Sequence, residues 1–561
     1  MDAYFKELIS LIKERGPSKE QLSRLKIELC RKYGRKSIPT DIEVLLNVGV
    51  EDLDLVRKFL VTKPVRTQSG VAVVAVMTAP FSCKHGKCTF CPGGPGSVYG
   101  DMPMSYTGKE PSTMRGVRNR YDPYLIVMNR LEQYVVLGQS PEKVEVVVMG
   151  GTFPSFDVGY QTDFVRGVFQ ALNDFSELFF DGSEFSVERF KEFFELPGKV
   201  ADAGRVERIH RKLNVYEGRR KGSLEDEEGR NERSCIRCVA LCIETKPDWC
   251  MRSEIDRMLV QGTTRVELGV QSVYDSVLKG VNRGHSVEDS IDATRLLKDS
   301  LLKVTYHVMP GLPGVSAEED EAGLLKLFSD PRFRPDALKV YPCMVMPGTP
   351  LWEQWKRGEF VPLSTAEAAE RIARFKRIIP KWCRVMRVQR DIPTYQTEAG
   401  VDRTNLRQYI EKVMKEKGWR CRCIRCREPK QDSVFEDVQV LVEEYDASEG
   451  KEVFISVEDV EKDVLLGFCR LRIPSKPFRK EFGLKTAGIR EVHVYGRAVG
   501  LGGEGEVQHK GLGMRLVQEA ERIAREKGME EMLIISGVGV REYYEKKLGY
   551  RRKGVYVWKR L

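Results

Sequence analysis

The chain has 561 residues, of which 92 are Lys or Arg, 82 are Asp or Glu, and 41% are hydrophobic. At about 100 to 200 residues per domain, this length excludes a single compact core, and the ordinary apolar share beside 31% charged residues excludes a disordered chain. No stretch approaches about 18 uninterrupted apolar residues and no apolar leader is present, so we expect no membrane span, a cytoplasmic location and 14 reduced cysteines available for metal binding or chemistry.

Residues 1–70 are predicted to form a small, basic helical region. Leu8, Leu22 and Leu25 belong to an apolar series with helical spacing. Between Ser10 and Ser37 there are nine basic residues against three acidic ones. A solvated helix face and a nucleic-acid contact both explain that excess, and the local sequence does not choose between them.

Residues 71–390 are predicted to form an α/β unit. Apolar strands alternate with helical patterns, which indicates a parallel sheet or a full or partial β/α barrel, with function at the carboxyl ends of the strands. A charged, Gly-containing segment near 176–233 interrupts the rhythm and is expected to be an inserted helix and a surface loop. The strands are expected at 71–77, 144–149, 239–243, 266–270, 304–309 and 338–341.

A cysteine loop follows the first of these strands. Cys83, Cys88 and Cys91 supply three thiols on one short loop, which fits three irons of a 4Fe-4S cluster and leaves the fourth iron open. An open iron is what reductive cleavage of S-adenosylmethionine requires. The alternative is a zinc loop without a fourth ligand nearby.

The end of the next strand supports the cluster interpretation. Gly150, Gly151 and Thr152 follow it, and their backbone groups could hydrogen-bond the amino group of a chelated methionine. With the cysteine loop, this arrangement resembles the radical S-adenosylmethionine superfamily, although its C-x4-C-x2-C spacing is one residue longer than the commonest C-x3-C-x2-C.

Residues 391–430 are a polar connector with a second thiol group. Cys421, Cys423 and Cys426 lie within six residues and are predicted to bind zinc, with Cys343 as the candidate fourth ligand of a tetrahedral site. A second iron-sulfur cluster and plain reduced thiols are the alternatives.

Residues 431–561 are predicted to form a separate α/β domain with a nucleotide-binding turn. Gln508, Gly511 and Gly513 open a long amphipathic helix, whose free backbone N–H groups and dipole favour a bound pyrophosphate. The strands and helices around this turn resemble the GNAT-type acetyltransferases, which bind acetyl-CoA there. Tyr543 or Tyr544 is a candidate proton donor to the leaving CoA thiolate, although adjacent tyrosines on a helix are often core and surface residues.

From about Met77 to Leu561 the sequence resembles the family of Elongator catalytic subunits in their single-chain archaeal form. The phrases SYTGKEP, MGGTF, IETKPD, ELGVQS, MPGLPG, YPCMVMPGT, NLRQ, VHVYG, QHKGLG and ISGVG carry the resemblance. It implies an acyltransferase that builds the carboxymethyl group at C5 of the tRNA wobble uridine from acetyl-CoA by S-adenosylmethionine-derived radical chemistry. The implied partners are the tRNA anticodon stem-loop and an electron donor.

The resemblance also implies site residues. Lys143, Tyr543 and Tyr544 are the implied catalytic residues, and Glu267 and Gln271 are predicted for the adenosine side, with polar packing inside the barrel as their alternative. The positions that match the family's acetyl-CoA contacts are Lys143, Glu491, Val492, His493, Val494, Leu512, Gly513, Met514 and Tyr544.

The tRNA surface is predicted from charge. Residues 371–390 hold eight basic residues and no acidic one, with Trp382 among them as a possible stacking partner for bases. We expect this stretch and residues 13–36 to converge on one face around the barrel mouth. The competing functions are a protein lysine acetyltransferase with a structural iron-sulfur cluster, and an RNA-binding scaffold without activity.

Overall fold

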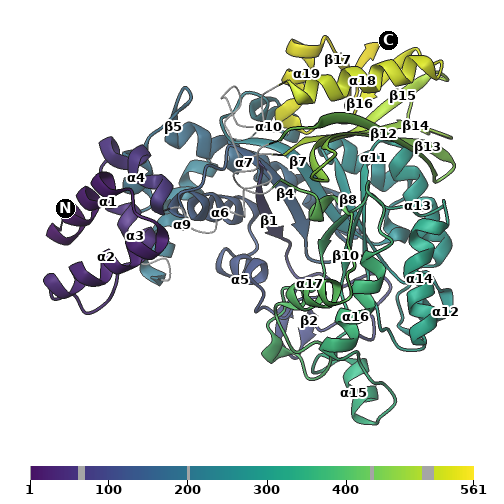
Figure 1. Cartoon of the computed structure of the whole chain (residues 1–561), viewed down its shortest axis with the longest axis horizontal. Coiled ribbons are helices and arrows are strands. Elements are labelled where there is room, and N and C mark those ends of the chain that lie inside the picture. The colour runs from purple at the N-terminus through teal and green to yellow at the C-terminus, as the bar shows by residue number, and fades with distance from the viewer. Residues whose placement is uncertain (1, 61–69, 199–201, 221, 430–434, 496–510) are drawn as a thin grey trace.

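The computed structural model describes residues 2–60, 70–198, 202–220, 222–429, 435–495 and 511–561. A small helical bundle holds the N-terminus, an open α/β barrel forms the centre, and a second α/β sheet covers one end of the barrel (Figure 1). The predicted fold class, a partial β/α barrel followed by a second α/β domain with a helical N-terminal region, is confirmed.

The N-terminal bundle forms because its helices have clear ends and one apolar face each. Ser18 and Thr40 begin two of them with capping boxes, and Gly16 ends the first in the left-handed conformation, at φ 53°. Tyr4 and Leu8 are among the residues of its own buried core. The helices are α1 (Ala3–Arg15), α2 (Lys19–Lys32), α3 (Asp41–Leu46) and α4 (Leu53–Leu60).

The central sheet is parallel throughout and open, in the order β1-β4-β7-β8-β9-β10-β11. Its strands are runs of Val, Ile and Leu because helices bury the outer face. They are β1 (Ala72–Met77), β4 (Lys143–Met149), β7 (Arg237–Thr245), β8 (Arg265–Gln271), β9 (Lys303–Val308), β10 (Ala337–Val340) and β11 (Arg384–Arg387).

Helices stand between consecutive strands of that sheet, and most of them cover its outer face, although the helix at 350–356 lies away from the sheet at the bottom of Figure 1. They are α5 (Pro111–Arg118), α6 (Pro123–Val136), α7 (Val158–Phe179), α11 (Arg252–Val260), α12 (Asp275–Gly280), α13 (Val287–Asp299), α14 (Ala317–Ser329), α15 (Pro350–Lys356) and α16 (Thr365–Lys376). A hairpin of β2 (Gly94–Ser97) and β3 (Gly100–Met102) follows the cysteine loop.

The insertion is more structured than its composition indicates. Instead of one helix and a loop it holds a short hairpin and three helices, and its phenylalanines pack together: Phe190 lies 5.4 Å from Phe179 and 4.9 Å from Phe194 between ring centroids. The elements are β5 (Phe180–Asp181), β6 (Glu184–Phe185), α8 (Val187–Phe193), α9 (Ala203–Glu217) and α10 (Leu224–Asn231).

The second sheet has the order β12-β13-β14-β15-β16-β18-β17 and follows a connector that contains α17 (Leu406–Glu416). Its elements are β12 (Val438–Ala447), β13 (Gly450–Asp459), β14 (Val464–Ile473), β15 (Thr486–Val494), α18 (Leu512–Glu526), β16 (Glu531–Ile534), α19 (Arg541–Leu548), β17 (Arg551–Lys553) and β18 (Tyr556–Arg560). β15 and β16 pair in parallel only from Thr486 to Ile489, so β15 separates from β16 after Ile489. This divergence opens the sheet beside α18.

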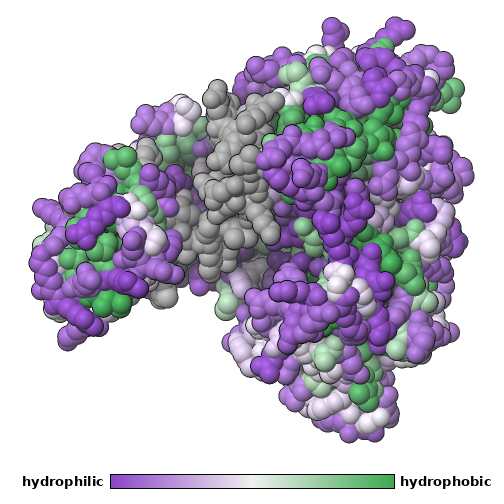
Figure 2. Space-filling model, viewed as in Figure 1, coloured by the Kyte–Doolittle hydropathy of each residue, from purple (hydrophilic) through white to green (hydrophobic). Residues whose placement is uncertain are grey.

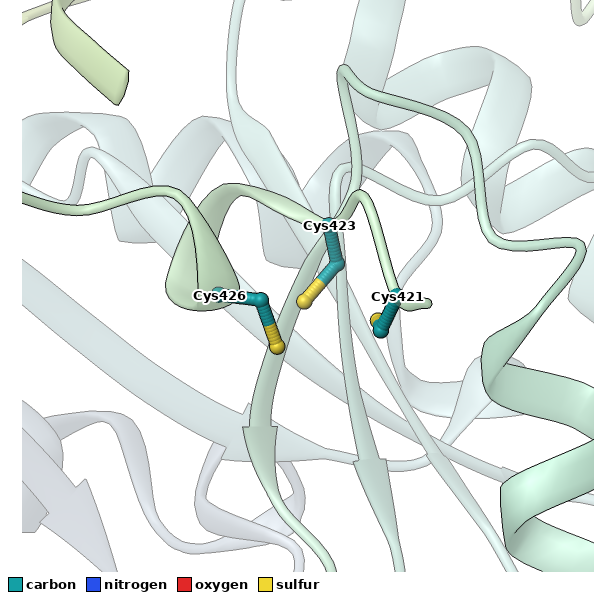
Figure 3. Close-up of side chains that lie close together, drawn as sticks. All are labelled: Cys421, Cys423 and Cys426. Carbon is teal, nitrogen blue, oxygen red and sulfur yellow. The ribbon is translucent and has the colours of Figure 1, made fainter. Parts of the chain in front are cut away.

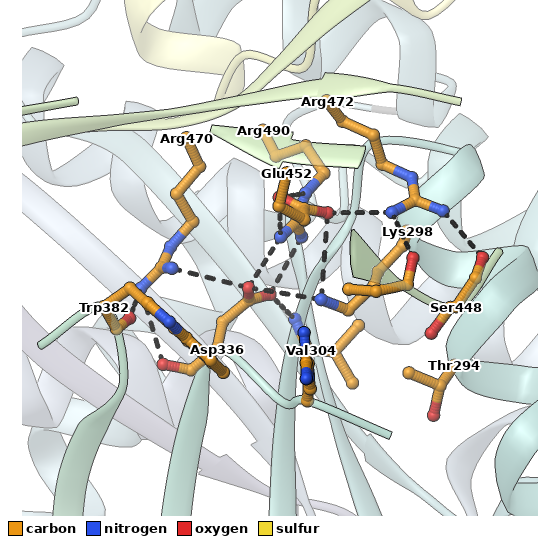
Figure 4. Close-up of polar contacts among 12 residues, drawn as sticks. Thr294, Lys298, Val304, Asp336, Trp382, Ser448, Glu452, Arg470, Arg472 and Arg490 are labelled. Atoms are coloured by element: carbon orange, nitrogen blue, oxygen red, sulfur yellow. Dashed lines mark hydrogen bonds and ion pairs between the residues drawn. The ribbon is translucent and has the colours of Figure 1, made fainter. Parts of the chain in front are cut away.

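Buried ion pairs hold the second sheet on the amino ends of the barrel strands (Figure 4). Arg490 of β15 reaches Asp336, the residue before β10, at 2.6 and 2.8 Å. Arg472 of β14 reaches Asp299 at the end of α13. The second domain therefore lies on the side of the barrel opposite to the carboxyl ends of the strands.

Hydrophilic residues cover most of the face seen in Figure 2, where apolar residues form separate patches over the N-terminal bundle and beside the second sheet. Among the described helices, none is long and apolar enough to cross a membrane.

Candidate functional site: one cavity between two cofactor-type sites

The cysteine loop lies at the carboxyl end of β1, as predicted. Cys88 and Cys91 are buried, and the three thiols Cys83, Cys88 and Cys91 do not all lie within 4.8 Å of one another. Thiolates that share one zinc ion lie about 3.8 Å apart, from a Zn–S bond of about 2.3 Å and tetrahedral angles. The spacing therefore fits separate irons of a cluster better than one ion.

Polar groups surround these sulfurs. The Ser105 N–H points at Cys91 Sγ from 3.3 Å, and the Arg283 guanidinium lies 3.6 Å from Cys88 Sγ. Burial raises the pKa of Cys83 and of Cys91, while Arg283 lowers the pKa of Cys83. Burial is the larger effect, so the pKa of both thiols is raised overall.

The neighbouring strand ends form a concave pocket with unusual backbone. Gly150 and Gly151 both have φ of 125°, and a Cβ on Gly150 would come within 2.3 Å of Thr78 Oγ1, so the turn requires glycine. Gln271, at φ 67°, holds a buried Oε1 that has no partner among the described residues. An unpaired buried acceptor beside the cysteine loop fits the predicted S-adenosylmethionine site.

Unlike Gln271, Glu267 is surrounded by partners. Its side chain is 0% exposed, and Arg265, His307 and Lys339 surround its two oxygens. These contacts favour polar packing, the alternative weighed for Glu267, over a contact with adenosine.

The acetyl-CoA-type turn lies beside the gap between β15 and β16. Gly511 precedes α18 at φ 77°, and no side chain caps the helix in the part of the chain that the structure describes. Gly511 and Gly513 line the cavity. A Cβ on Gly513 would lie 3.7 Å from Tyr543 Oη and 3.9 Å from Val494. Gln508 lies outside the described residues.

The two tyrosines differ in their surroundings. Tyr543 is 37% exposed beside Gly513, whereas Tyr544 is 8% exposed and packs in the domain core against Tyr550. Burial raises the pKa of both phenols. Of the two, Tyr543 is placed to give a proton to a group bound at the turn.

Other residues predicted for acetyl-CoA surround the same opening. Glu491 forms ion pairs with Lys303 and Arg470; burial alone would raise its pKa, but these charges lower it to about 2. Lys143 stands at the start of β4, on the rim of the barrel that faces the second sheet. Val492, His493, Val494 and Met514 line the cavity, and Leu512 packs against the core of the second domain.

One cavity of about 2410 Å³ joins the two sites. At one end it is lined by Cys83, Cys88 and Cys91, and at the other by Gly513 and Tyr543. It runs through the inside of the open barrel, past residues of β4, β8, β9 and β10. A small molecule bound at the turn and a reactive group at the cysteine loop thus share one continuous space.

The connector cysteines gather as predicted, but their proposed partner does not. The sulfurs of Cys421, Cys423 and Cys426 lie within 4.8 Å of one another (Figure 3), which suits a single zinc ion. Cys343 is not part of this group. It is fully buried in the apolar cluster that contains Cys88, because the chain after β10 turns toward the cysteine loop; the prediction of Cys343 as fourth ligand is wrong.

The predicted tRNA surface is also corrected. Trp382 is 3% exposed and stacks on Tyr445 at 4.2 Å, so it is a core residue and not a platform for bases. The N-terminal helices lie at the left of Figure 1 and α16 at its lower centre, so the two basic stretches do not converge around the barrel mouth. Many of their side chains pair with acidic neighbours, as Lys19 does with Asp41 and Arg371 with Asp320.

These features define a class of protein, the radical S-adenosylmethionine half-barrel joined to a GNAT domain. The chain matches the ELP3 N-terminal domain over residues 1–68, the Radical SAM superfamily over 81–323, the Radical_SAM C-terminal domain over 335–416 and the Acetyltransferase (GNAT) family over 416–550. By overall similarity, the chain belongs to the Elongator complex protein 3 family.

The relatives cover the chain almost completely. It is 46% identical to the tRNA uridine(34) acetyltransferase of Methanocaldococcus infernus, over 97% of this chain and 96% of that protein. It is 39% identical to the Elongator complex protein 3 of Homo sapiens, over 96% and 93%. The solved structure of archaeal Methanocaldococcus infernus Elp3 with an N-terminal deletion (1–46) covers 88% of this chain and all of that one, with 42% identity and a TM-score of 0.71.

Proposed function

We propose that this chain is a tRNA-modifying acyltransferase that forms 5-carboxymethyluridine at the wobble position from acetyl-CoA, with S-adenosylmethionine as the radical source. The observation that carries the proposal is the single cavity that joins the cysteine loop to the Gly511–Gly513 turn. A protein that only transferred acetyl groups to lysine would have no use for that connection. Two archaeal relatives bear the name tRNA uridine(34) acetyltransferase, which agrees with this assignment.

The residues of the cavity support distinct roles. Cys83, Cys88 and Cys91 would hold a 4Fe-4S cluster, which when bound supplies the reducing electron and an open iron for S-adenosylmethionine. Gln271 and the backbone of Gly150 would bind S-adenosylmethionine. An external donor must supply the electron.

On the second domain, the amino end of α18 would bind the pyrophosphate of CoA through its N–H groups and dipole. Tyr543, beside Gly513, would hydrogen-bond the CoA held at the turn. The three connector thiolates would hold zinc. The substrate would be the anticodon stem-loop of a cytoplasmic tRNA.

Reconstitution tests the whole proposal. The protein is loaded anaerobically with iron and sulfide, reduced with dithionite, and mixed with S-adenosylmethionine, acetyl-CoA and tRNA. We expect 5'-deoxyadenosine and, after nuclease digestion, 5-carboxymethyluridine. Cys83→Ala should abolish both. If a fully loaded protein forms no 5'-deoxyadenosine, the radical chemistry is wrong, and if Cys83→Ala keeps full acetyl transfer to protein lysines, the lysine acetyltransferase alternative is right.

A further inference from the structure

Four ionisable side chains form a row across the inside of the open barrel. Glu244, Glu267, His307 and Lys339 stand on the neighbouring strands β7, β8, β9 and β10. The strand register places Glu244 opposite Glu267 and Lys339 opposite His307. All four line the cavity between the cysteine loop and the acetyl-CoA-type turn.

The centre of the row is a carboxylate–imidazole pair. His307 Nε2 lies 2.7 Å from Glu267 Oε2. Burial alone would raise the pKa of Glu267, but the charges of Lys339 and Arg265 outweigh it and hold this pKa well below its ordinary value. An ionised carboxylate can only accept hydrogen bonds, so Nε2 of His307 carries the proton and Nδ1 is the basic nitrogen.

The pair is oriented toward the cavity. Glu267 is completely buried, whereas the His307 side chain is 15% exposed on the cavity wall. No described residue hydrogen-bonds Nδ1, and the ring of Tyr341 holds the imidazole edge-on at 5.6 Å between centroids. A buried acid that fixes the tautomer of an accessible imidazole is the arrangement by which enzymes position a general base.

A metal ion is the competing occupant of this place, since ligand atoms of Glu244, Glu267 and His307 lie within 4.8 Å of one another. The Lys339 ammonium, however, already touches both carboxylates, at 3.3 Å from Glu244. A positive charge among the carboxylates replaces a cation electrostatically. The row is therefore complete without a metal.

We propose that His307 is the general base that hydrolyses the thioester of the carboxymethyl intermediate, and that Glu267 positions it. Nδ1 takes a proton from water while the water oxygen bonds to the thioester carbonyl carbon. The carbon–sulfur bond then breaks, the proton passes to the CoA thiolate, and the products are the free acid and CoA. The inference rests on the function proposed above.

The position of His307 agrees with this step. In the carboxymethyl intermediate the thioester carbonyl is bonded to the carbon that joins the base, so it lies close to where the new bond forms. That place is near the cysteine loop, at the carboxyl ends of the strands. His307 is the fifth of the six residues of β9 and the next to last before that end.

The test compares His307→Ala and His307→Gln with the matched control His210→Gln. His210 belongs to the insertion, lies outside the cavity and forms a hydrogen bond with Asn119. With the loaded enzyme, acetyl-CoA, S-adenosylmethionine and tRNA, we expect both His307 variants to bind tRNA and form 5'-deoxyadenosine within about 2-fold of the wild type. CoA release should fall by about 100-fold or more, the share of a general base. Mass spectrometry of the digested tRNA should then show the uridine that still carries CoA, and added imidazole should restore CoA release to His307→Ala.

The outcomes separate the inference from the function on which it rests. If the wild type makes no 5-carboxymethyluridine, the proposed function fails. Suppose that the wild type makes 5-carboxymethyluridine. The assignment of His307 is then wrong if the His307 variants release CoA at the wild-type rate. It is also wrong if they lose CoA release and 5'-deoxyadenosine formation together and imidazole does not restore them. His307→Gln keeps a polar side chain of similar length, and a comparison of its melting temperature with that of His210→Gln identifies a folding defect. Accumulation of the CoA-linked uridine in either folded His307 variant supports the assignment.

Discussion

Replacing Asp336 by Asn should weaken the contact between the barrel and the second domain more than any exposed substitution does. Asp336 is fully buried, accepts two hydrogen bonds from Arg490 and one from the Val304 N–H at 2.8 Å, and lies 3.8 Å from Lys298 (Figure 4). Removing one partner of a buried ion pair costs about 3–5 kcal/mol, because the remaining charge stays buried and uncompensated. The affected cations are Lys298, Arg470 and Arg490.

The pH dependence of this cost follows from Lys298. Burial lowers the pKa of Lys298 from 10.5 to about 8, despite Asp336 and Glu452 nearby. The folded protein therefore binds fewer protons than the unfolded chain between about pH 8 and 10.5, and this residue's contribution makes stability rise with pH across that window. Below pH 8 Lys298 is charged in both the folded protein and the unfolded chain, so folding then carries the whole free-energy cost of burying that charge. In Asp336→Asn the cost should be largest near pH 7 and smaller near pH 9.5, where Lys298 is neutral.

Calorimetry of the full chain at both pH values measures this effect. Asp446→Asn is the control, because Asp446 and its partner Lys451 are 68% and 61% exposed, and such pairs contribute little. We expect the control to unfold at the temperature of the wild type. In Asp336→Asn the first unfolding transition should occur at a clearly lower temperature. Equal stability of Asp336→Asn at pH 7 would refute the account of uncompensated buried charge, and an equal loss at both pH values would refute the role of Lys298.

Three further predictions concern the metal, the proton donor and the RNA. Cys423→Ser should lose bound zinc by elemental analysis, and Cys343→Ser should keep it; loss from both would return Cys343 to the site. Tyr543→Phe should raise the KM for acetyl-CoA about 10-fold, as expected for loss of one hydrogen bond to CoA at the turn, whereas Tyr544→Phe should mainly lower the melting temperature; the reverse pattern would exchange their roles. Arg387→Glu, at a side chain 49% exposed on the cavity, should weaken tRNA binding and reduce its salt dependence, and unchanged affinity would remove Arg387 from the RNA contact.

The sequence predicted the parts of this protein that depend on neighbouring residues. The cysteine loop follows its strand within six residues, and the glycine at 511 begins a helix that is amphipathic along its length. Alternation of apolar strands with helices led to the parallel sheet because the strand faces that pack against the covering helices carry apolar side chains. Such signals are complete within a short window, so no knowledge of the distant chain is needed to interpret them.

The errors concern pairings between distant residues. Trp382 stands in a basic stretch, but the residue that covers it, Tyr445, belongs to another domain. Cys343 and Cys423 are separated by 80 positions, and cysteine spacing over that length does not determine which cysteines lie close together in the fold. His307 was missed because a single histidine in an apolar strand gives no pattern. Its partner Glu267 was noticed, but the register pairs Glu267 with Thr305, and only the side-chain contact in the fold joins it to His307.

The same register sets a requirement on the reaction. Glu491, one of the residues predicted for acetyl-CoA, pairs with Lys303, the first residue of β9, while His307 and the cysteine loop lie toward the other end of that strand. The four residue steps from Lys303 to His307, at about 3.3 Å each, span about 13 Å. If both sites act in one reaction, the acyl end of CoA must run along the inside of the barrel, past the Arg265–Glu267–Lys339 ion pairs.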